Sequence, residues 1–285
     1  MGVTVTIIAM GEMGSGVAAR LVERGARVLT SLEGRSAASA ERAKAAGVQV
    51  APDDQALVSG ADLVLSIVPP AHAAGLARRL LPAIRRANPR TVYVDCNAVA
   101  PQTVKAIAAP FAEAGVAFVD AGIIGGPPTR QGYSPRIYAS GPQAEAFAAL
   151  TARGLDIPVL SASVGDASAL KMAYAGTTKG AHAVMICMML GAARAGVGEA
   201  FAAEMGHSQA GRLEAAVRQL PAVLRKAYRW DGEMEEIAKF LLPEAGGDLI
   251  FRGAAALYRD LARDVDAGPD AERLALLEKF RASDL

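Results

Sequence analysis

The chain has 285 residues, of which 52% are hydrophobic and 21% charged, and its 30 Lys and Arg residues nearly balance its 29 Asp and Glu residues. Such a composition excludes a disordered or fibrous chain, and the length is sufficient for two domains. The formal net charge of +1 creates no global field that would attract nucleic acid or a membrane surface, so we expect a small-molecule partner, no nucleic acid and no membrane.

The two cysteines, Cys96 and Cys187, have the spacing of neither a metal site nor a disulfide framework, and we interpret both as buried thiols. No basic leader segment precedes the first apolar strand, and the uncharged run at 181–193 is too short to span a bilayer. These features predict a cytoplasmic protein without a bound metal.

Through roughly the first 160 residues, short β-branched runs alternate with Ala-rich helical stretches, which is typical of βαβ units in a parallel sheet. Continuous apolar runs such as residues 63–68 predict strands that are covered on both faces. We expect strands at residues 3–9, 27–32, 48–50, 62–68, 91–95, 116–120, 136–140 and 158–161. The predicted fold class is therefore an α/β Rossmann-type doubly wound sheet.

A tight glycine turn joins the first strand to a helix in the segment IIAMGEMGSG at residues 7–16. Its register is Gly-x-Gly-x-x-Gly, with Ala9 in the first place, Gly11 where the backbone approaches a pyrophosphate, and Gly14 where the helix packs on the strand. Backbone N–H groups from Gly11, Glu12, Met13 and Gly14 would bind the pyrophosphate at the positive end of the helix dipole. An ordinary βα turn is the alternative, but the flanking strand and helix also match.

The end of the second strand bears on the choice between NAD and NADP. Leu32 occupies the place of the acid that binds the ribose, while Arg35 and Ser36 can bind a 2′-phosphate through charge-assisted hydrogen bonds. Arg35 can also be a solvated residue at a helix start, and Glu33 can take the role of the acid. NADP is the favoured cofactor and NAD the alternative.

After Val164 the strand-like runs nearly vanish, and helix-forming residues recur at helical spacing, so the second half is predicted to be all α. Its first helix is expected at residues 166–195, a length of roughly 45 Å at 1.5 Å per residue. Because it is apolar around much of its circumference, we expect this helix to be buried between subunits or domains.

Five segments in a specific order resemble the β-hydroxyacid dehydrogenase superfamily, which includes 3-hydroxyisobutyrate dehydrogenases, phosphogluconate dehydrogenases and imine reductases. They are the glycine turn, SIVPP at 66–70, VDCNA at 94–98, DAGIIGG at 120–126 and GDASALK at 165–171. The resemblance implies an NAD(P)-binding Rossmann domain at residues 1–162 and an all-helical substrate and dimerisation domain at residues 163–285. It also implies a homodimer that forms through the helical domain.

Ligands of doubly wound sheets bind beyond the carboxyl ends of the strands, where Val68, Pro69 and Asn97 fall. Val68 and Pro69 would border the nicotinamide ribose, and Asn97 would bind the carboxamide or the substrate. A rigid strand exit and a turn-forming asparagine are the alternatives. We expect Asp95 and Asp120 to act as caps or turns rather than as acids.

The glycine-rich stretch at 122–126 would present backbone N–H groups to a substrate carboxylate, because glycine adopts the dihedrals of an anion-binding nest. Substrate contacts are therefore expected from Ile123, Ile124, Gly125 and Gly126, with a mobile turn as the alternative. Relative to the family pattern, Ile124 stands where a serine is usual.

Hydride transfer to a carbonyl leaves negative charge on the oxygen, and a nearby ammonium can bind that oxygen and supply the proton. Lys171, which matches the lysine of the family's helix motif, is the expected catalytic residue, with a snorkelling lysine as the alternative. Tyr174 and Thr178 share its helix face at three- and four-residue spacing and are expected to contact the substrate. Ala175 stands where the family usually has asparagine.

The favoured function is NAD(P)-linked interconversion of a hydroxyl and a carbonyl on a small carboxylate-bearing substrate, with Lys171 as proton donor and acceptor. An imine reductase is an alternative, although that group typically carries Asp or Tyr in place of this lysine. A cofactor-binding protein without catalysis is a third possibility, because Ala9, Ile124 and Ala175 depart from the enzyme pattern.

Overall fold

The computed structural model describes residues 2–88, 90–129 and 132–282. The chain divides into two compact units, Met1–Met172 and Ala173–Leu285. Residues 163–172, which the sequence pattern groups with the helical half, belong to the first unit.

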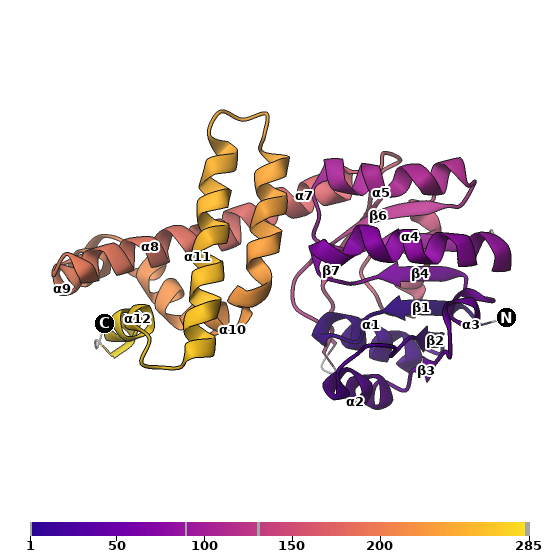
Figure 1. Ribbon diagram of the computed structural model, residues 1–285, viewed down its shortest axis with the longest axis horizontal. Coiled ribbons are helices and arrows are strands. Elements are labelled where there is room, and N and C mark those ends of the chain that lie inside the picture. Colours follow the sequence, from indigo (N-terminus) through magenta and orange to yellow (C-terminus); the bar gives the residue numbers. More distant parts are fainter. Residues whose placement is uncertain (1, 89, 130–131, 283–285) are drawn as a thin grey trace. The chain divides into compact units, whose positions relative to one another are not determined.

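An eight-stranded sheet forms the centre of the first unit, in the order β3-β2-β1-β4-β5-β6-β7-β8 (Figure 1). The pair β6–β7 is antiparallel and the other pairs are parallel. All eight predicted strands are present, but β6 extends beyond its predicted end because Ile124 still pairs with Arg136 of β7. The strands are β1 Thr4–Ile8, β2 Arg27–Thr30, β3 Gln49–Val50, β4 Leu63–Ser66, β5 Val92–Asp95, β6 Phe118–Ile124, β7 Arg136–Ser140 and β8 Val159–Ser161.

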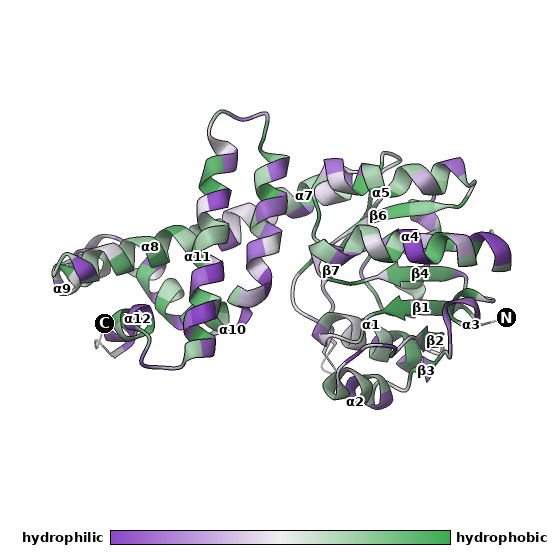
Figure 2. Ribbon diagram, viewed as in Figure 1, coloured by the Kyte–Doolittle hydropathy of each residue, from purple (hydrophilic) through white to green (hydrophobic). Residues whose placement is uncertain are grey.

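Helices cover both faces of this sheet, because successive strand residues alternate between two separate hydrophobic clusters. Ile7 packs in one cluster with α1 (Glu12–Glu23), α2 (Ala37–Ala45) and α6 (Ala144–Ala148). Ile8 packs in the other with α3 (Asp54–Val58), α4 (Pro70–Ala87) and α5 (Pro101–Glu113). A 3-10 helix, Ala149–Arg153, follows α6. Figure 2 shows hydrophobic residues on the central strands and hydrophilic residues on the flanking helices. The predicted α/β doubly wound fold is confirmed.

The second unit is all helical, as predicted. Its long helices α10 and α11 lie side by side and are joined by a short loop (Figure 1). Trp230 of α10 packs edge-on against Tyr258 of α11, with ring centroids 5.2 Å apart. The helices that follow the boundary are α8 Ala181–Arg194, α9 Gly198–Ser208, α10 Ala210–Phe240, α11 Gly247–Ala267 and α12 Glu272–Ala282.

The long helix predicted at 166–195 is present, but it contains a wider turn. Helical residues continue without a break through α7 (Asp166–Ala175), a π-helical turn (Gly176–Gly180) and α8. Within this turn, the hydroxyls of Thr177 and Thr178 donate to the carbonyl oxygen of Tyr174 at 2.9 and 3.2 Å. A Cβ on Gly180 would lie 2.9 Å from Cε1 of Phe251, so glycine permits the close approach of α11.

The two cysteines differ in their environments. Cys96 is buried, but Cys187 is exposed on α8, so the prediction of two buried thiols is wrong for Cys187. Val184, one helical turn before it, and Met188, which follows Val184 by four residues, are also exposed on α8.

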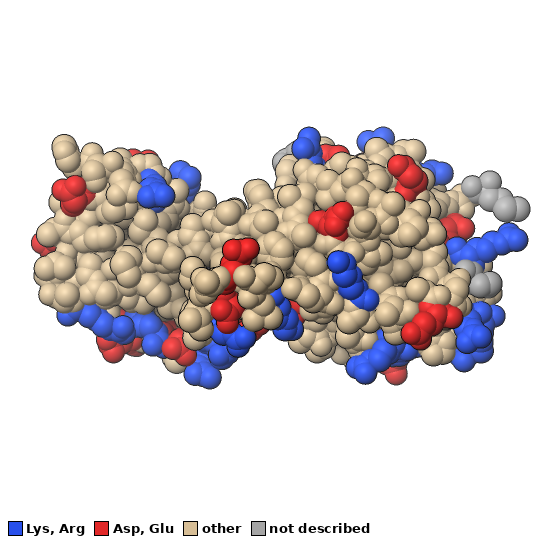
Figure 3. All heavy atoms as spheres, turned by 90° about the horizontal axis from the view of Figure 1, so that it is seen from above, with Lys and Arg blue, Asp and Glu red and all other residues tan. Residues whose placement is uncertain are grey.

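The surface carries both signs of charge, and Lys, Arg, Asp and Glu side chains are interspersed on the face in Figure 3. Among the residues that the structure describes, no helix has the length and apolar character needed to cross a bilayer.

Candidate active site at the carboxyl edge of the sheet

The carboxyl ends of four strands lie at one edge of the sheet in the first unit. One row of paired residues crosses these strands: Ile8 pairs with Ser66, Ser66 with Asp95, and Asp95 with Asp120. The first three are the last residues of β1, β4 and β5, whereas β6 continues beyond Asp120 to Ile124. The strand order reverses at β1, which has β2 on one side and β4 on the other. Doubly wound sheets bind their ligands at such a switch point, so this edge is the candidate site.

The glycine turn lies at this edge between β1 and α1. A Cβ on Gly14 would lie 2.0 Å from the carbonyl oxygen of Ala9, so only glycine lets α1 pack directly on the strand. A Cβ on Gly11 would meet no atom within 4 Å, so this position faces open space. As the N-cap residue of α1, Gly11 supplies no side-chain bond to the helix. The N–H groups at this helix start therefore adjoin open space, and free N–H groups at a helix start attract anions.

An arginine that sequence reasoning missed braces this turn. Nε of Arg42 on α2 donates to the carbonyl oxygen of Met10 at 2.8 Å. The contact joins residues that are 32 positions apart. In the sequence, Arg42 looks like an ordinary polar residue on a helix.

The residues after β2 lie on the surface and at the start of α2. Leu32 packs against the hydrophobic cluster on that side of the sheet, and Arg35 and Glu33 are exposed. Ser36 is the N-cap of α2, where its hydroxyl accepts from the backbone N–H of Ser39 at 3.3 Å. The structure thus brings an exposed guanidinium next to a helix N-terminus, and both features attract a phosphate.

Asn97 connects the ends of β4 and β5. Its Oδ1 accepts from the backbone N–H of Val68 at 2.7 Å, and its Nδ2 donates to the hydroxyl of Ser66 at 2.8 Å. The asparagine is 3% exposed, and Pro69, the next residue after Val68, is exposed. Asn97 therefore orders the strand exits, and Pro69 is the group of this set that faces outward.

Asp95 forms the turn that precedes Asn97, as predicted. Its Oδ1 accepts from the backbone N–H of Asn97 at 3.0 Å. Burial raises the pKa of Asp95 to about 7. The hydrogen bond from Asn97 lowers this pKa, and the negative charge of Asp120 adds to the rise. A large part of this carboxyl population is therefore protonated near neutral pH.

Asp120 caps the start of α7, also as predicted. Its Oδ2 accepts from the backbone N–H groups of Gly165 and Ser168 at 2.9 and 3.0 Å, and its Oδ1 accepts from the Ser168 hydroxyl at 2.7 Å. Burial raises the pKa of Asp120, and the hydrogen bonds from Ser168 oppose this rise. This cap, which β6 supplies, explains why the start of α7 belongs to the first unit.

The cap brings Lys171 to the end of β6. Nζ of Lys171 donates to the carbonyl oxygen of Ile123 at 2.8 Å. A Cβ on Gly122 would lie 2.7 Å from the carbonyl oxygen of Ala167 and 3.0 Å from Cβ of Lys171, so glycine lets α7 approach the strand. The ammonium therefore lies at the same edge as the glycine turn.

The glycine-rich stretch at 122–126 is only partly a loop. Residues 122–124 belong to β6, with Ile123 buried and Ile124 half-buried. Gly125 and Gly126 follow the strand and are exposed, and Gly125 has φ +127°. The backbone N–H of Gly126 donates to the hydroxyl of Tyr133 at 3.2 Å, a partner that sequence reasoning missed.

The two other residues expected to contact substrate lie in the second unit. The side chain of Tyr174 is 49% exposed. The hydroxyl of Thr178 donates to the carbonyl oxygen of Ala175 at 3.2 Å, within its own helix.

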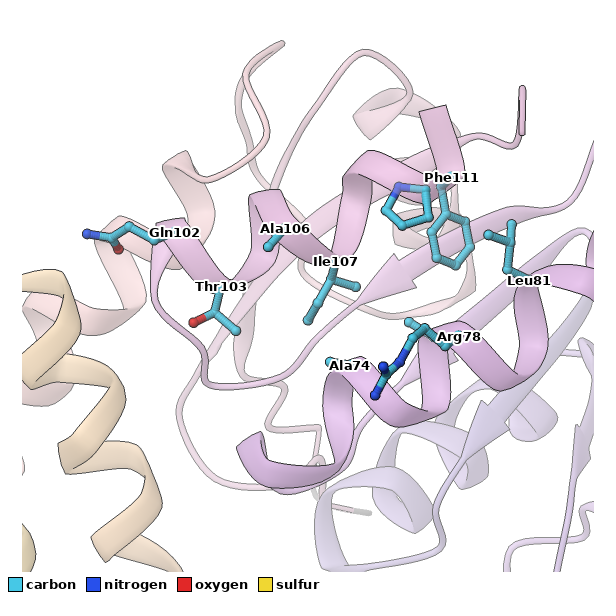
Figure 4. A pocket seen from close by; sticks show the side chains of 10 residues that line it. Ala74, Arg78, Leu81, Gln102, Thr103, Ala106, Ile107 and Phe111 are labelled. Carbon is cyan, nitrogen blue, oxygen red and sulfur yellow. The ribbon is translucent and has the colours of Figure 1, made fainter. Parts of the chain in front are cut away.

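A separate hollow of about 520 Å³ lies between α4 and α5 (Figure 4). Its lining is mainly apolar, with Arg78, Gln102 and Thr103 as its polar side chains, and it contains no residue predicted for the site. Among the described residues, no group of three or more His, Cys, Asp or Glu side chains could hold a metal ion.

Comparison with known proteins agrees with this geometry. The NAD binding domain of 6-phosphogluconate dehydrogenase matches residues 4–152, and a domain of unknown function, DUF1932, matches residues 192–261. An uncharacterised 28.5 kDa protein from Methanothermus fervidus is 31% identical over 179 residues, which cover 63% of this chain and 66% of that relative. The matched part therefore spans less than two thirds of that relative.

Two of the solved structures that resemble nearly the whole chain illustrate the relationship. One is a conserved protein of unknown function described as structurally similar to 3-hydroxyacid dehydrogenases; it is 33% identical, covers 92% of this chain and 98% of its own, and has a TM-score of 0.66. The other is 3-hydroxyisobutyrate dehydrogenase from Mycobacterium tuberculosis with L-serine. It is 18% identical, the match covers 99% of this chain and 100% of that one, and the TM-score is 0.70. The chain thus belongs to the β-hydroxyacid dehydrogenase superfamily, with an NAD-binding domain of the 6-phosphogluconate dehydrogenase type.

Proposed function

We propose that this chain is an NAD(P)-dependent oxidoreductase that interconverts a hydroxyl and a carbonyl on a small carboxylate-bearing substrate. The position of Lys171 carries the proposal, because its Nζ is held by the carbonyl oxygen of Ile123 at the edge of the sheet where the glycine turn lies. Parallel sheets of this type bind dinucleotides at that edge, so an ammonium there can act on a group that meets the nicotinamide.

The chain's own residues supply binding and proton transfer. When bound, the nicotinamide donates or accepts a hydride. The bond to Ile123 anchors an ammonium that carries three N–H donors, and Lys171 can donate to a carbonyl oxygen as negative charge develops on it. In the opposite direction, the neutral amine accepts the hydroxyl proton.

The other residues proposed for the cofactor and substrate sites lie mostly at the same edge of the sheet. Gly11, Glu12, Met13 and Gly14 bind the pyrophosphate in this proposal, and Val68 and Pro69 border the nicotinamide ribose. Asn97 holds Val68 in place, since its side chain binds the Val68 N–H and the Ser66 hydroxyl. Ile123, Ile124, Gly125 and Gly126 border the substrate. Tyr174 and Thr178 are also proposed substrate contacts.

NADP is the proposed cofactor. The support is the exposed Arg35 beside Ser36 at the start of α2, together with the apolar Leu32 in the place of a ribose-binding acid. A guanidinium and a helix N-terminus would both stabilise a 2′-phosphate.

Turnover on a panel of substrates tests the proposal. The purified chain is assayed with NADP⁺ and NAD⁺ on short hydroxy acids, including 3-hydroxyisobutyrate and L-serine. We expect oxidation of at least one acid and a loss of about 10²-fold or more in kcat for Lys171→Met, because proton transfer is removed. Lys105→Met, which removes an exposed ammonium from α5, is the matched control and keeps wild-type turnover.

An imine reductase is the second candidate, because imine reductases share this fold. NADPH consumption with cyclic imines, but with no carbonyl acid, would reverse the order of the two candidates. Tight NADPH binding without turnover on either panel would instead favour a cofactor-binding protein without catalysis.

A homodimer through the helical domain is also proposed. Val184 and Met188 on α8 are 56% and 54% exposed, and they line a hollow of about 480 Å³ together with Phe201 and Met205 of α9. Exposed apolar surface of this kind favours a protein interface. Light scattering at micromolar concentration should give twice the mass of one chain, and the mass of a single chain would contradict the dimer.

A further inference from the structure

The end of β6 is built around the hydroxyl of Tyr133. The backbone N–H of Gly126 donates to the Tyr133 hydroxyl at 3.2 Å. A Cβ on the preceding residue, Gly125, would overlap that hydroxyl, and the φ of +127° at Gly125 disfavours any other residue type. Glycine at this position therefore makes room for the phenol.

The loop that carries Tyr133 is fastened to α1, the helix that begins at the glycine turn. Nη2 of Arg20 donates to the carbonyl oxygens of Thr129 and Tyr133 at 2.8 and 3.4 Å. Nη1 of Arg20 donates to the carbonyl oxygen of Gly154 at 3.2 Å, and the side chain is 8% exposed. One helical turn earlier, a Cβ on Gly16 would lie 3.1 Å from Pro127 and Pro128. The phenol is thus held in a fixed position relative to the cofactor helix.

The hydroxyl retains a proton that it can donate. A phenol can accept one hydrogen bond and donate another, and Tyr133 already accepts from Gly126. Among the described residues, no protein acceptor binds the Tyr133 proton. The Tyr133 side chain is 48% exposed, and the neighbouring Gly125 and Gly126 are also exposed. A ligand can therefore reach the hydroxyl.

We propose that the Tyr133 hydroxyl binds the substrate carboxylate and so helps to determine substrate specificity. This inference rests on the function proposed above and identifies the group that receives the acidic end of the substrate. Because the Gly126 N–H is occupied, the carboxylate accepts from the phenol instead of directly from this N–H.

The Lys171 amine and the Tyr133 hydroxyl contact backbone groups three positions apart. Lys171 is bound at Ile123 and Tyr133 at Gly126, positions that an extended chain separates by at most about 10 Å. Both groups therefore lie at the end of β6.

A binding titration tests this inference without requiring turnover. The probe is 3-hydroxypropionate, added in large millimolar excess to the full chain saturated with NADPH. NADPH is the reduced cofactor, so the probe binds without being oxidised. The readouts are the NMR signals of the Gly126 amide and of Cζ of Tyr133. We expect both signals to shift in the wild type. Tyr133→Phe should bind the probe at least about 10-fold more weakly, because a hydrogen bond to a charged group is lost.

Ser134→Ala is the matched control, because its hydroxyl donates to the backbone oxygen of Pro135 on the same loop at 3.3 Å. This variant should bind the probe like the wild type, and Tyr133→Phe should keep the wild-type melting temperature. Absence of shifts in the wild type, or equal affinity in wild type and Tyr133→Phe, overturns the inference.

The titration separates this inference from the proposed function. Lys171→Met should lose turnover, and the probe should still shift the Gly126 amide and Tyr133 Cζ signals of this variant. If the wild type oxidises no hydroxy acid but binds the probe through Tyr133, the proposed function fails and the inference stands. If turnover occurs and Tyr133→Phe leaves KM unchanged, the inference alone fails.

Discussion

Replacing Gly11 by alanine should separate cofactor binding from folding. The new Cβ meets no protein atom within 4 Å, and the dihedrals, φ −71° and ψ −175°, are available to alanine. Reduced freedom of the unfolded chain stabilises such a variant by about 0.4–1 kcal/mol, and the loss of glycine from the N-cap opposes this. The melting temperature should therefore change by less than about 4 °C.

Binding should respond differently, because the methyl group occupies the space assigned to the pyrophosphate. We expect the Kd for NADPH to rise at least about 10-fold, which corresponds to about 1.4 kcal/mol. The assays are thermal melts without cofactor and calorimetric titration with NADPH. Wild-type affinity for Gly11→Ala would refute the placement of the pyrophosphate at this turn.

Gly14→Ala provides the contrast. Its Cβ would lie 2.0 Å from the carbonyl oxygen of Ala9, so β1 and α1 must separate to restore an ordinary contact. Overpacking of this kind costs about 1–3 kcal/mol, and we expect a clear fall in melting temperature as well as weaker NADPH binding. Equal stability of the two alanine variants would contradict the packing described for the turn.

Three further predictions concern other parts of the first unit. Arg20→Ala should reduce the free energy of unfolding by about 1–3 kcal/mol in denaturant melts, because three carbonyl oxygens lose a buried donor. Arg153→Ala, which removes a solvent-exposed bond to a carbonyl oxygen, should cost less than about 0.5 kcal/mol. Equal losses in the two variants would contradict a stabilising role for the buried bonds of Arg20. Burial raises the pKa of Asp95 from 3.8 to about 7, so between these pH values the folded state keeps a proton that the unfolded state has lost. The contribution of Asp95 to the free energy of unfolding therefore falls as the pH rises from about 4 to about 7. Asp95→Asn removes this contribution, and its stability relative to the wild type should rise between about pH 4 and pH 7, whereas parallel pH profiles would show that Asp95 does not titrate abnormally. Arg35→Ala should weaken NADPH binding about 10-fold more than NADH binding in paired titrations, and an equal effect on both cofactors would place the 2′-phosphate elsewhere.

The fold was predictable wherever local periodicity carries the information. Strands such as Leu63–Ser66 are continuous apolar runs because both faces of the sheet are covered, and they are visible in the sequence. The extension of β6 to Ile124 was not predictable, because it depends on pairing with Arg136 across a loop. The π-helical turn was missed for a similar reason, since its glycines pack against Phe251, which lies in a distant helix.

The candidate site was predictable to the extent that its residues follow strand ends. Gly14 and Asp120 have the roles expected of a packing glycine and a cap. Arg20 and Tyr133 were missed because their contacts join separated segments: the bond from Arg20 to the Thr129 carbonyl spans 109 positions. A tyrosine in a Gly- and Pro-rich loop also has no periodic pattern that would reveal its role.

The position of the Lys171 amine relative to a bound nicotinamide tests the central claim most directly. In a crystal structure of the chain with NADPH, we expect Nζ of Lys171 within about 6 Å of the nicotinamide C4, which leaves room for one carbonyl group between hydride donor and ammonium. A nicotinamide ring bound at the same edge, but with the Lys171 amine directed away from it into solvent, would contradict the proposed role.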